Sequence, residues 1–86
     1  MLHIKEIKHI RAKIVWISFD DGVSGTVDLD GALQGPVFEP LHDDNEFSKM
    51  YVDPELETIA WPNGADLAPE FVKDLLTEQT LARRQG

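Results

Sequence analysis

KIVWISFDDGVSGTVDL, at residues 13–29, contains two runs of β-forming residues that meet at Asp20, Asp21 and Gly22. A two-residue loop of Asp21 and Gly22 would mix apolar and polar side chains on both faces of a hairpin. A three-residue loop that includes Asp20 separates them, and its final glycine supplies the left-handed backbone that such a loop needs. The apolar face is then Val15, Ile17, Phe19, Val23, Gly25, Val27 and Leu29, and the opposite face carries Ser18, Ser24, Thr26 and Asp28.

The residues before this hairpin predict a third strand. Leu2 and Ile4 alternate with polar residues, and the apolar phase then slips near Glu6. Such a slip is typical of a strand with a bulge. We expect a strand over 2–8 and a turn over 9–12, which together give a three-stranded meander.

The middle of the chain predicts short, irregular elements. Asp30 can cap a single helical turn that ends at Gly35, because two prolines follow and stop any longer helix. Asp43 stands three residues before a glutamate, at capping-box spacing, so we expect a helix over 43–49. The apolar residues expected to anchor this region in the core are Leu33, Val37, Phe38, Leu41 and Phe47.

The last third predicts two short strands, over 50–52 and 57–61, and then one sizeable helix over 69–81. The helix has an apolar stripe that must lie on the sheet. The stripe consists of Leu67, Phe71, Val72, Leu75 and Leu76. The predicted fold class is therefore α+β: a small antiparallel or mixed sheet, made of the N-terminal meander and the short C-terminal strands, packed on one C-terminal helix. We expect a single domain over 1–86, with its core over 2–81 and a frayed tail over 82–86.

Composition restricts the classes of function. The chain has 86 residues and no cysteine, which excludes disulfides and thiolate metal sites. It has no apolar run of membrane-spanning length, and its first residues interleave charged with apolar side chains, unlike a signal peptide. We expect a soluble protein of the cytoplasm with no membrane partner.

The charge is unevenly distributed. Residues 1–13 carry a net charge of +3, so the other 73 residues carry −11 of the total of −8. Nucleic acid should be repelled by most of this surface, because sequence-independent affinity comes from basic side chains that neutralise phosphates. A small, basic protein is the charge-compatible partner. The alternative is that the acidic excess only keeps the domain in solution.

No catalytic or ligand-binding motif stands out. The segment 28–31 resembles the start of a calcium loop, but Thr26 and Val37 would fall at its first and last ligand positions. The three histidines have no zinc-site spacing, and no serine lies in a nucleophile elbow. We therefore predict no enzyme, no metal and no cofactor.

Several motifs together resemble a small bacterial family called domain of unknown function 2442. They are FDDG at 19–22, VDL at 27–29, VFEPL at 37–41, Phe47 and WPNGADL at 61–67, followed by Pro69 and Glu70. The resemblance implies an α+β domain encoded beside a second small protein, in an arrangement like toxin and antitoxin pairs. Some members add a DNA-binding helix-turn-helix domain. One departure is Ala68, where the family often has a helix-capping serine.

The candidate interaction surface consists of Trp16, Trp61, Asn63 and Asp66. Tryptophan contributes strongly to interfaces, and loop tips often carry function, although the WPNGAD turn also has a sufficient structural explanation. The hairpin register turns Trp16 away from the apolar face, so a second layer, a partner or a homodimer mate must cover it. Our leading hypothesis is a non-enzymatic interaction module that binds a basic protein, antitoxin-like in a two-gene pair. The alternative is a small-molecule or regulatory domain with a pocket near Trp61.

Overall fold

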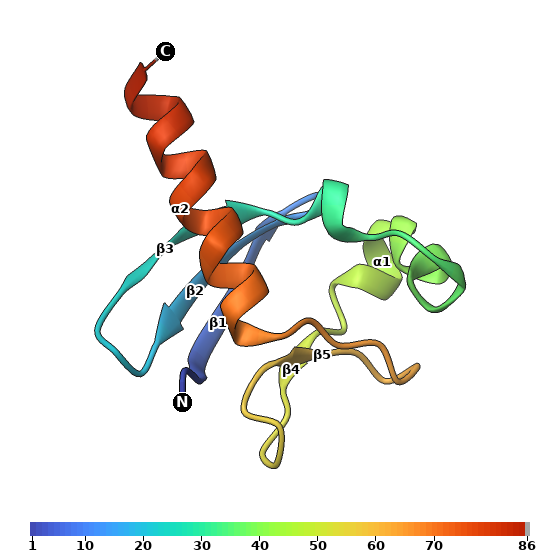
Figure 1. The fold of residues 1–86 in the computed structure, drawn as a ribbon. Helices are drawn as coiled ribbons and strands as arrows, with labels where there is room; N and C mark the ends of the chain where they lie inside the picture. Colours follow the sequence, from blue (N-terminus) through green and yellow to red (C-terminus); the bar gives the residue numbers. More distant parts are fainter. Residues whose placement is uncertain (86) are drawn as a thin grey trace.

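The computed structural model describes residues 1–85 and shows an α+β protein (Figure 1). A three-stranded antiparallel sheet has the order β1-β2-β3, and a separate two-stranded antiparallel sheet pairs β4 with β5. The predicted fold class is confirmed. The strands are β1 (Ile4–Arg11), β2 (Ile14–Phe19), β3 (Ser24–Asp28), β4 (Tyr51–Val52) and β5 (Ile59–Ala60). The α-helices are α1 (Asp44–Phe47) and α2 (Pro69–Gln85), and the 3-10 helices are η1 (Asp30–Ala32) and η2 (Pro36–His42).

The hairpin of β2 and β3 has the predicted register. Ile17 pairs with Gly25, and the Phe19 N–H donates to the Val23 carbonyl at 2.8 Å, which leaves a three-residue loop. Gly22 has a φ of +89°, in the region that favours glycine. The side chains of the predicted apolar face are buried except Val23, which is 40% exposed because it lies next to the loop. The prediction that Val23 is buried with the rest of this face was wrong.

Strand β1 lies later in the sequence than predicted, because it starts at Ile4 and not at residue 2. The expected bulge is present, as a register shift between Ile4 and Glu6, but the strand continues to Arg11. A second register shift lies between His9, which pairs with Val15, and Arg11, which pairs with Ile14. The turn therefore falls at 12–13 and not at 9–12.

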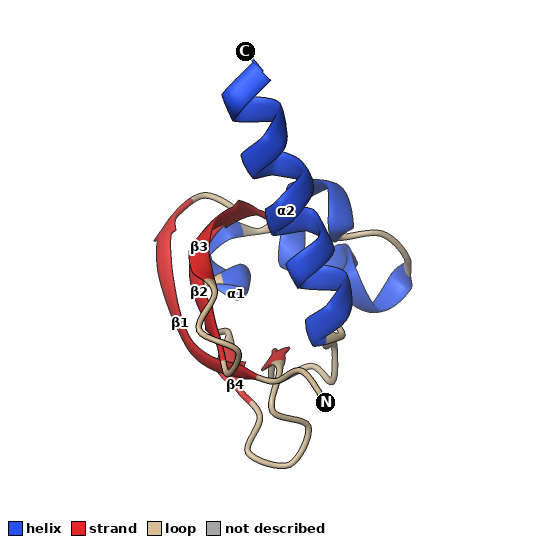
Figure 2. Ribbon diagram, turned by 60° about the vertical axis from the view of Figure 1, so that its left-hand side comes forward, coloured by secondary structure: helices blue, strands red, loops and turns tan. Residues whose placement is uncertain are grey.

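Within residues 1–85, all the helices lie on one side of the three-stranded sheet, and no other element covers its opposite face (Figure 2). Helix α2 packs closely on β3 at Gly25, where an added Cβ would lie 2.9 Å from Leu76 Cδ1. The predicted stripe of α2 is buried or partly buried except Phe71, which is 44% exposed, because it lies at the margin of the helix face that meets the sheet. The core comprises Ile4, Val15, Ile17, Phe19, Val27, Leu29, Leu33, Leu41, Phe47, Ile59, Trp61, Ala65, Leu67, Val72 and Leu76.

The middle segment is more helical than predicted. The two prolines do not end the helical backbone, because η2 includes both, and a 3-10 helix accommodates them. Among the expected anchors, Val37 is 43% exposed, so that prediction was wrong, whereas the others are buried or partly buried. Asp43 caps α1 as predicted, since its side chain accepts hydrogen bonds from the N–H groups of Asn45 and Glu46.

The end of the chain also differs. Strands β4 and β5 are shorter than predicted, and α2 continues to Gln85 instead of ending near residue 81. The residues predicted as a frayed tail are thus helical up to 85, and residue 86 lies outside the described part. No helix in residues 1–85 combines the length and the apolar character needed to cross a membrane.

Candidate interaction surface

Trp61 is a core residue. Its side chain is 1% exposed, packs against the rings of Phe38 and Phe47, and donates its indole N–H to the Phe47 carbonyl at 2.9 Å. A buried tryptophan whose N–H is bonded has no atoms left for a partner. The prediction that Trp61 belongs to an interaction surface was therefore wrong.

Asn63 also has a structural role. Its Nδ2 donates to the Val37 carbonyl at 2.8 Å, and its Oδ1 accepts the Ala65 N–H at 3.1 Å. These bonds hold the turn, in which Gly64 has a φ of +93°, against η2. Asp66 is exposed and joins β5 through an isolated bridge with Ala60.

Trp16 lies on the uncovered side of the three-stranded sheet, as the parity of β2 predicts. It is half-buried, and Lys8 Nζ lies 5.7 Å from the centre of its ring. Cross-strand partners share a face of a sheet, so the register identifies its neighbours. We call this surface the outer face: Glu6, Lys8, Arg11, Ile14, Trp16, Ser18, Ser24, Thr26 and Asp28. The four predicted residues thus do not form one surface.

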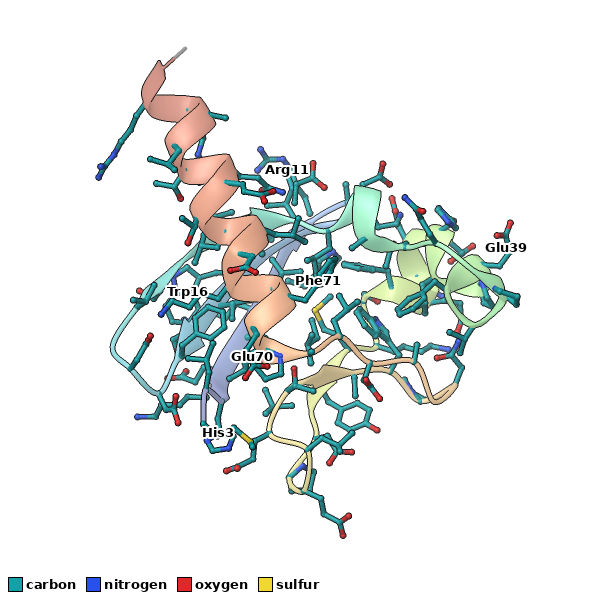
Figure 3. All side chains as sticks on the ribbon, in the orientation of Figure 1. His3, Arg11, Trp16, Glu39, Glu70 and Phe71 are labelled. Atoms are coloured by element: carbon teal, nitrogen blue, oxygen red, sulfur yellow. The ribbon has the colours of Figure 1, made fainter. Side chains whose placement is uncertain are left out.

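A second surface lies on α2. Glu70, Asp74 and Glu78 follow one another at intervals of four residues and are exposed, so they form one row on the helix; we call it the acidic row. None of the three takes part in an ion pair within the described chain. Phe71 and Leu81, which are 44% and 50% exposed, lie beside this row. Figure 3 shows Glu70 and Phe71 near the start of α2.

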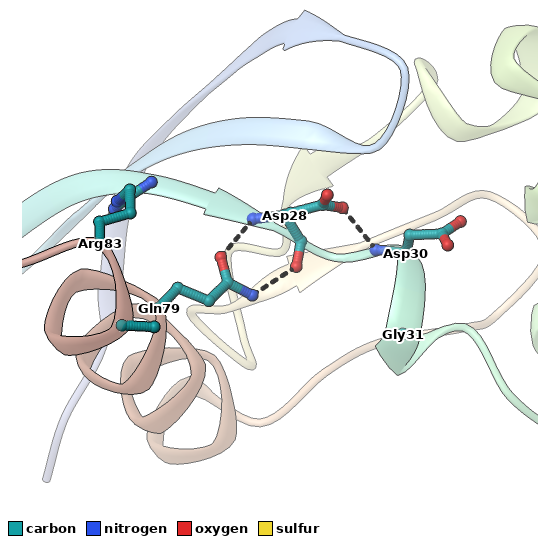
Figure 4. A pocket seen from close by; sticks show the side chains of 6 residues that line it. Asp28, Asp30, Gly31, Gln79 and Arg83 are labelled. Atoms are coloured by element: carbon teal, nitrogen blue, oxygen red, sulfur yellow. Dashed lines mark hydrogen bonds between the residues drawn. The ribbon is translucent and has the colours of Figure 1, made fainter. Parts of the chain in front are cut away.

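An open groove separates β3 and η1 from α2 (Figure 4). Its volume is about 490 Å³, and the Asp28 main chain and the Gln79 side chain are hydrogen-bonded to each other within it. Its lining residues are Asp28, Asp30, Gly31, Gln79, Ala82 and Arg83. The pocket that we predicted near Trp61 is not this groove, because Trp61 is enclosed in the core.

Asp20 and Asp21, in the loop between β2 and β3, bond to other segments of the chain. The His3 main-chain N–H and ring Nδ1 bond the Asp20 carboxylate at 3.0 and 2.9 Å, and His3 Nε2 lies 3.0 Å from Glu57 Oε2. The two bonds from His3 to Asp20, the main-chain one foremost, lower the pKa of Asp20. The pKa of Asp21 is lowered by its bond from Lys73 and then by the Val23 N–H. Both carboxylates are exposed and already bonded, which suits a structural role.

Two residues with important contacts escaped the sequence analysis. Lys13 is 8% exposed, and its ammonium group bonds the His42 carbonyl and Asp44 above the Phe47 ring. Gln79 bonds the main chain of β3. In both cases the partners lie 29 to 51 residues away, so no local pattern signals them. Within residues 1–85, no group of three or more histidine or acidic side chains is placed to hold a metal ion.

Comparison with known proteins gives one match. A family model described as "Protein of unknown function (DUF2442)" matches residues 4–75. No curated protein and no solved structure matches the chain. The matched region contains both sheets, the whole outer face and the first part of α2.

Proposed function

Because this chain belongs to the DUF2442 family, whose description assigns no activity, we propose its function from its surfaces: it is a non-enzymatic module that binds a basic protein. In this proposal it is the acidic, antitoxin-like member of a two-gene pair and acts in the cytoplasm. The observation that carries the proposal is the acidic row of α2 with Phe71 beside it.

The acidic row has the composition of a docking site for a basic protein. Its three carboxylates form no ion pair with the residues that the structure describes, whereas Lys13, Lys49 and Lys73 are each paired with an acidic residue. A partner can therefore bind these carboxylates without breaking a contact of the fold. Charges of this kind accelerate association and select partners of opposite sign.

Phe71 supplies the apolar part of the same site. Helical spacing places it three residues before Asp74 and seven before Glu78, so the aromatic ring and two carboxylates share one side of α2. An exposed aromatic residue bordered by charges is typical of the centre and rim of an interface. We therefore expect the partner to present an apolar pocket edged by lysine or arginine.

Co-expression of the whole chain with the product of the adjacent gene tests the proposal. We expect the two proteins to purify together at low salt, and the complex to weaken as salt rises, because exposed charge pairs are screened. The variant Glu70→Gln/Asp74→Asn/Glu78→Gln should abolish co-purification. Phe71→Ser should weaken it by about tenfold or more, as loss of a central aromatic anchor does.

A matched control keeps the same change of net charge on another surface. Glu39→Gln/Glu55→Gln/Asp66→Asn removes three exposed carboxylates outside α2, and Leu56→Ser removes an apolar side chain that is 54% exposed. Both should leave the complex intact. Absence of a complex at low salt, or equal losses in the two triple variants, would contradict the proposal.

A further inference from the structure

The outer face of the sheet has no covering layer within the described residues, although it carries apolar side chains. Ile14 and Trp16 are half-buried there, and every helix lies on the other side of the sheet (Figure 2). The cross-strand neighbours of Trp16 are Lys8 and Thr26, and its ring is partly exposed beneath the Lys8 ammonium group. Tryptophan in such a position is the residue most often found to anchor a partner.

Strand β1, which forms one margin of this face, is the basic region of an acidic protein. Lys5, Lys8 and Arg11 all belong to β1, and none of them forms an ion pair in the described chain. The net charge of the whole chain is −8, so these three cations form a local exception. Lys8 and Arg11 lie on the outer face, and Lys5 lies at the register shift beside it. Glu6 is the acidic residue of β1, whereas Asp28 lies two strands away, on β3.

The two edges of the sheet also differ. The edge of β3 is occupied, because Gln79 bonds the Asp28 main chain and Arg83 bonds the Thr26 carbonyl. At the edge of β1, the Ile4 N–H bonds the Glu57 carbonyl, and no other main-chain bond joins β1 to a segment outside its sheet in residues 1–85. An exposed edge strand favours a partner in extended conformation.

We infer that the outer face is a second docking surface, which binds an acidic, extended segment of another protein. Trp16 contacts an apolar side chain of that segment, and Lys8 and Arg11 bind its carboxylates. This surface lies on the side of the sheet opposite α2 and selects a partner of opposite charge to that of the acidic row. It therefore goes beyond the proposed function and does not depend on it.

Charge argues for this occupant over two others. A second copy of the chain would bring the lysines of two β1 strands together, and lysine on an edge strand discourages self-pairing. Nucleic acid needs many cations to bind without sequence preference, and the −11 carried by the other 73 residues opposes a long polyanion. A short acidic segment meets the three local cations and extends little beyond them.

A binding titration of the whole chain tests the inference. The probe is a fluorescein-labelled peptide of sequence Glu-Thr-Phe-Thr-Glu-Thr-Glu, whose phenylalanine and glutamates share one face when it is extended. The lysine-for-glutamate version is its charge control. We expect the acidic peptide alone to bind at low salt. Lys8→Gln/Arg11→Gln and Trp16→Thr should each weaken binding by about tenfold, as loss of a charge pair or an aromatic anchor does.

Control variants separate this surface from general charge effects. Lys49→Gln/Arg84→Gln also removes two cations but lies outside the outer face, and it should bind the acidic peptide as the parent chain does. Neutralising the acidic row should not weaken peptide binding, so failure of the proposed function and failure of this inference are distinguishable. Thermal unfolding of Trp16→Thr shows whether a loss of peptide binding comes from misfolding. If it does, the binding of the peptide to Lys8→Gln/Arg11→Gln tests the inference.

Three results would overturn the inference. They are the absence of acidic-peptide binding at low salt, tighter binding of a short single-stranded oligothymidine through the same residues, and self-association of the parent chain that Trp16→Thr abolishes. Equal losses in the two lysine and arginine variants would likewise exclude a specific surface.

Discussion

The side chain of Gln79 in α2 makes the two hydrogen bonds to the Asp28 main chain that a neighbouring strand would make to β3. The Asp28 N–H donates to Gln79 Oε1 at 2.8 Å, and Gln79 Nε2 donates to the Asp28 carbonyl at 2.8 Å (Figure 4). Residues of paired antiparallel strands exchange the same two bonds. The helix therefore both covers the sheet and satisfies part of its edge.

Replacement of Gln79 should measure this contact. We expect Gln79→Ala to lower the free energy of unfolding by about 1–2 kcal/mol, because two exposed main-chain bonds are lost. Gln79→Glu should also destabilise, since its carboxylate faces the Asp28 carbonyl without a proton to donate. Urea unfolding provides the measurement, with Thr77→Ala as the control. Equal stability of Gln79→Ala and the control would contradict the role of the amide.

The lowered pKa values of Asp20 and Asp21 predict a loss of stability in acid. A carboxyl group whose pKa is lower in the folded than in the unfolded chain stabilises the fold above its unfolded pKa of about 3.9. That contribution is lost as the pH falls through the folded pKa of each group. We expect the urea midpoint to decrease from about pH 5 downward, and Asp20→Asn/Asp21→Asn to flatten this decrease. Asp74→Asn, on the acidic row, is the control that should retain the slope.

Lys13 should be sensitive to a change of chemistry that preserves its shape. Lys13→Met keeps the aliphatic stem against Phe47 but leaves the His42 carbonyl and Asp44 without their donor. We expect a loss of about 1–3 kcal/mol, the usual contribution of hydrogen bonds that involve a charged group. Thermal and urea unfolding of Lys13→Met, Asp44→Asn and the double variant give the coupling between the two residues. Additive losses would show that they are not coupled.

Replacement of Ala68 by serine should increase the stability of the protein. Its carbonyl accepts the Val72 N–H at 3.1 Å, which places it at the N-terminal cap of α2 without a side-chain acceptor. We expect Ala68→Ser to stabilise the protein by about 1 kcal/mol, the usual contribution of a serine cap. Ala82→Ser, within the same helix, should be neutral or destabilising. A melting temperature that does not rise in Ala68→Ser would reject the cap.

Local pattern accounts for the parts of the fold that were predicted well. The parity of the hairpin and the glycine at its loop determine which side chains of β2 reach the core, and that face is buried as expected. The cap at Asp43 depends on residues within one helical turn. These features need only short-range chemistry, so a single sequence contains them.

The errors concern packing between distant segments. Trp61 is buried because Phe38 and Phe47 enclose it, and no spacing in the WPNGAD turn indicates that. Phe71 fits the helical stripe but lies at its margin, where the direction in which α2 crosses the sheet decides exposure. The sequence analysis considered the acidic residues only through the net charge. In the structure, the turns of α2 place Glu70, Asp74 and Glu78 in one row.

The two tryptophans give this small protein separate optical signals. Trp61 is enclosed among aromatic rings with its indole N–H bonded, whereas Trp16 is partly buried beside Lys8 on the other side of the sheet. Emission from Trp61 therefore reports the integrity of the interior, and emission from Trp16 reports what happens at the outer face. Variants that retain only one indole would let unfolding and ligand occupancy be followed independently by intrinsic fluorescence, with no added dye.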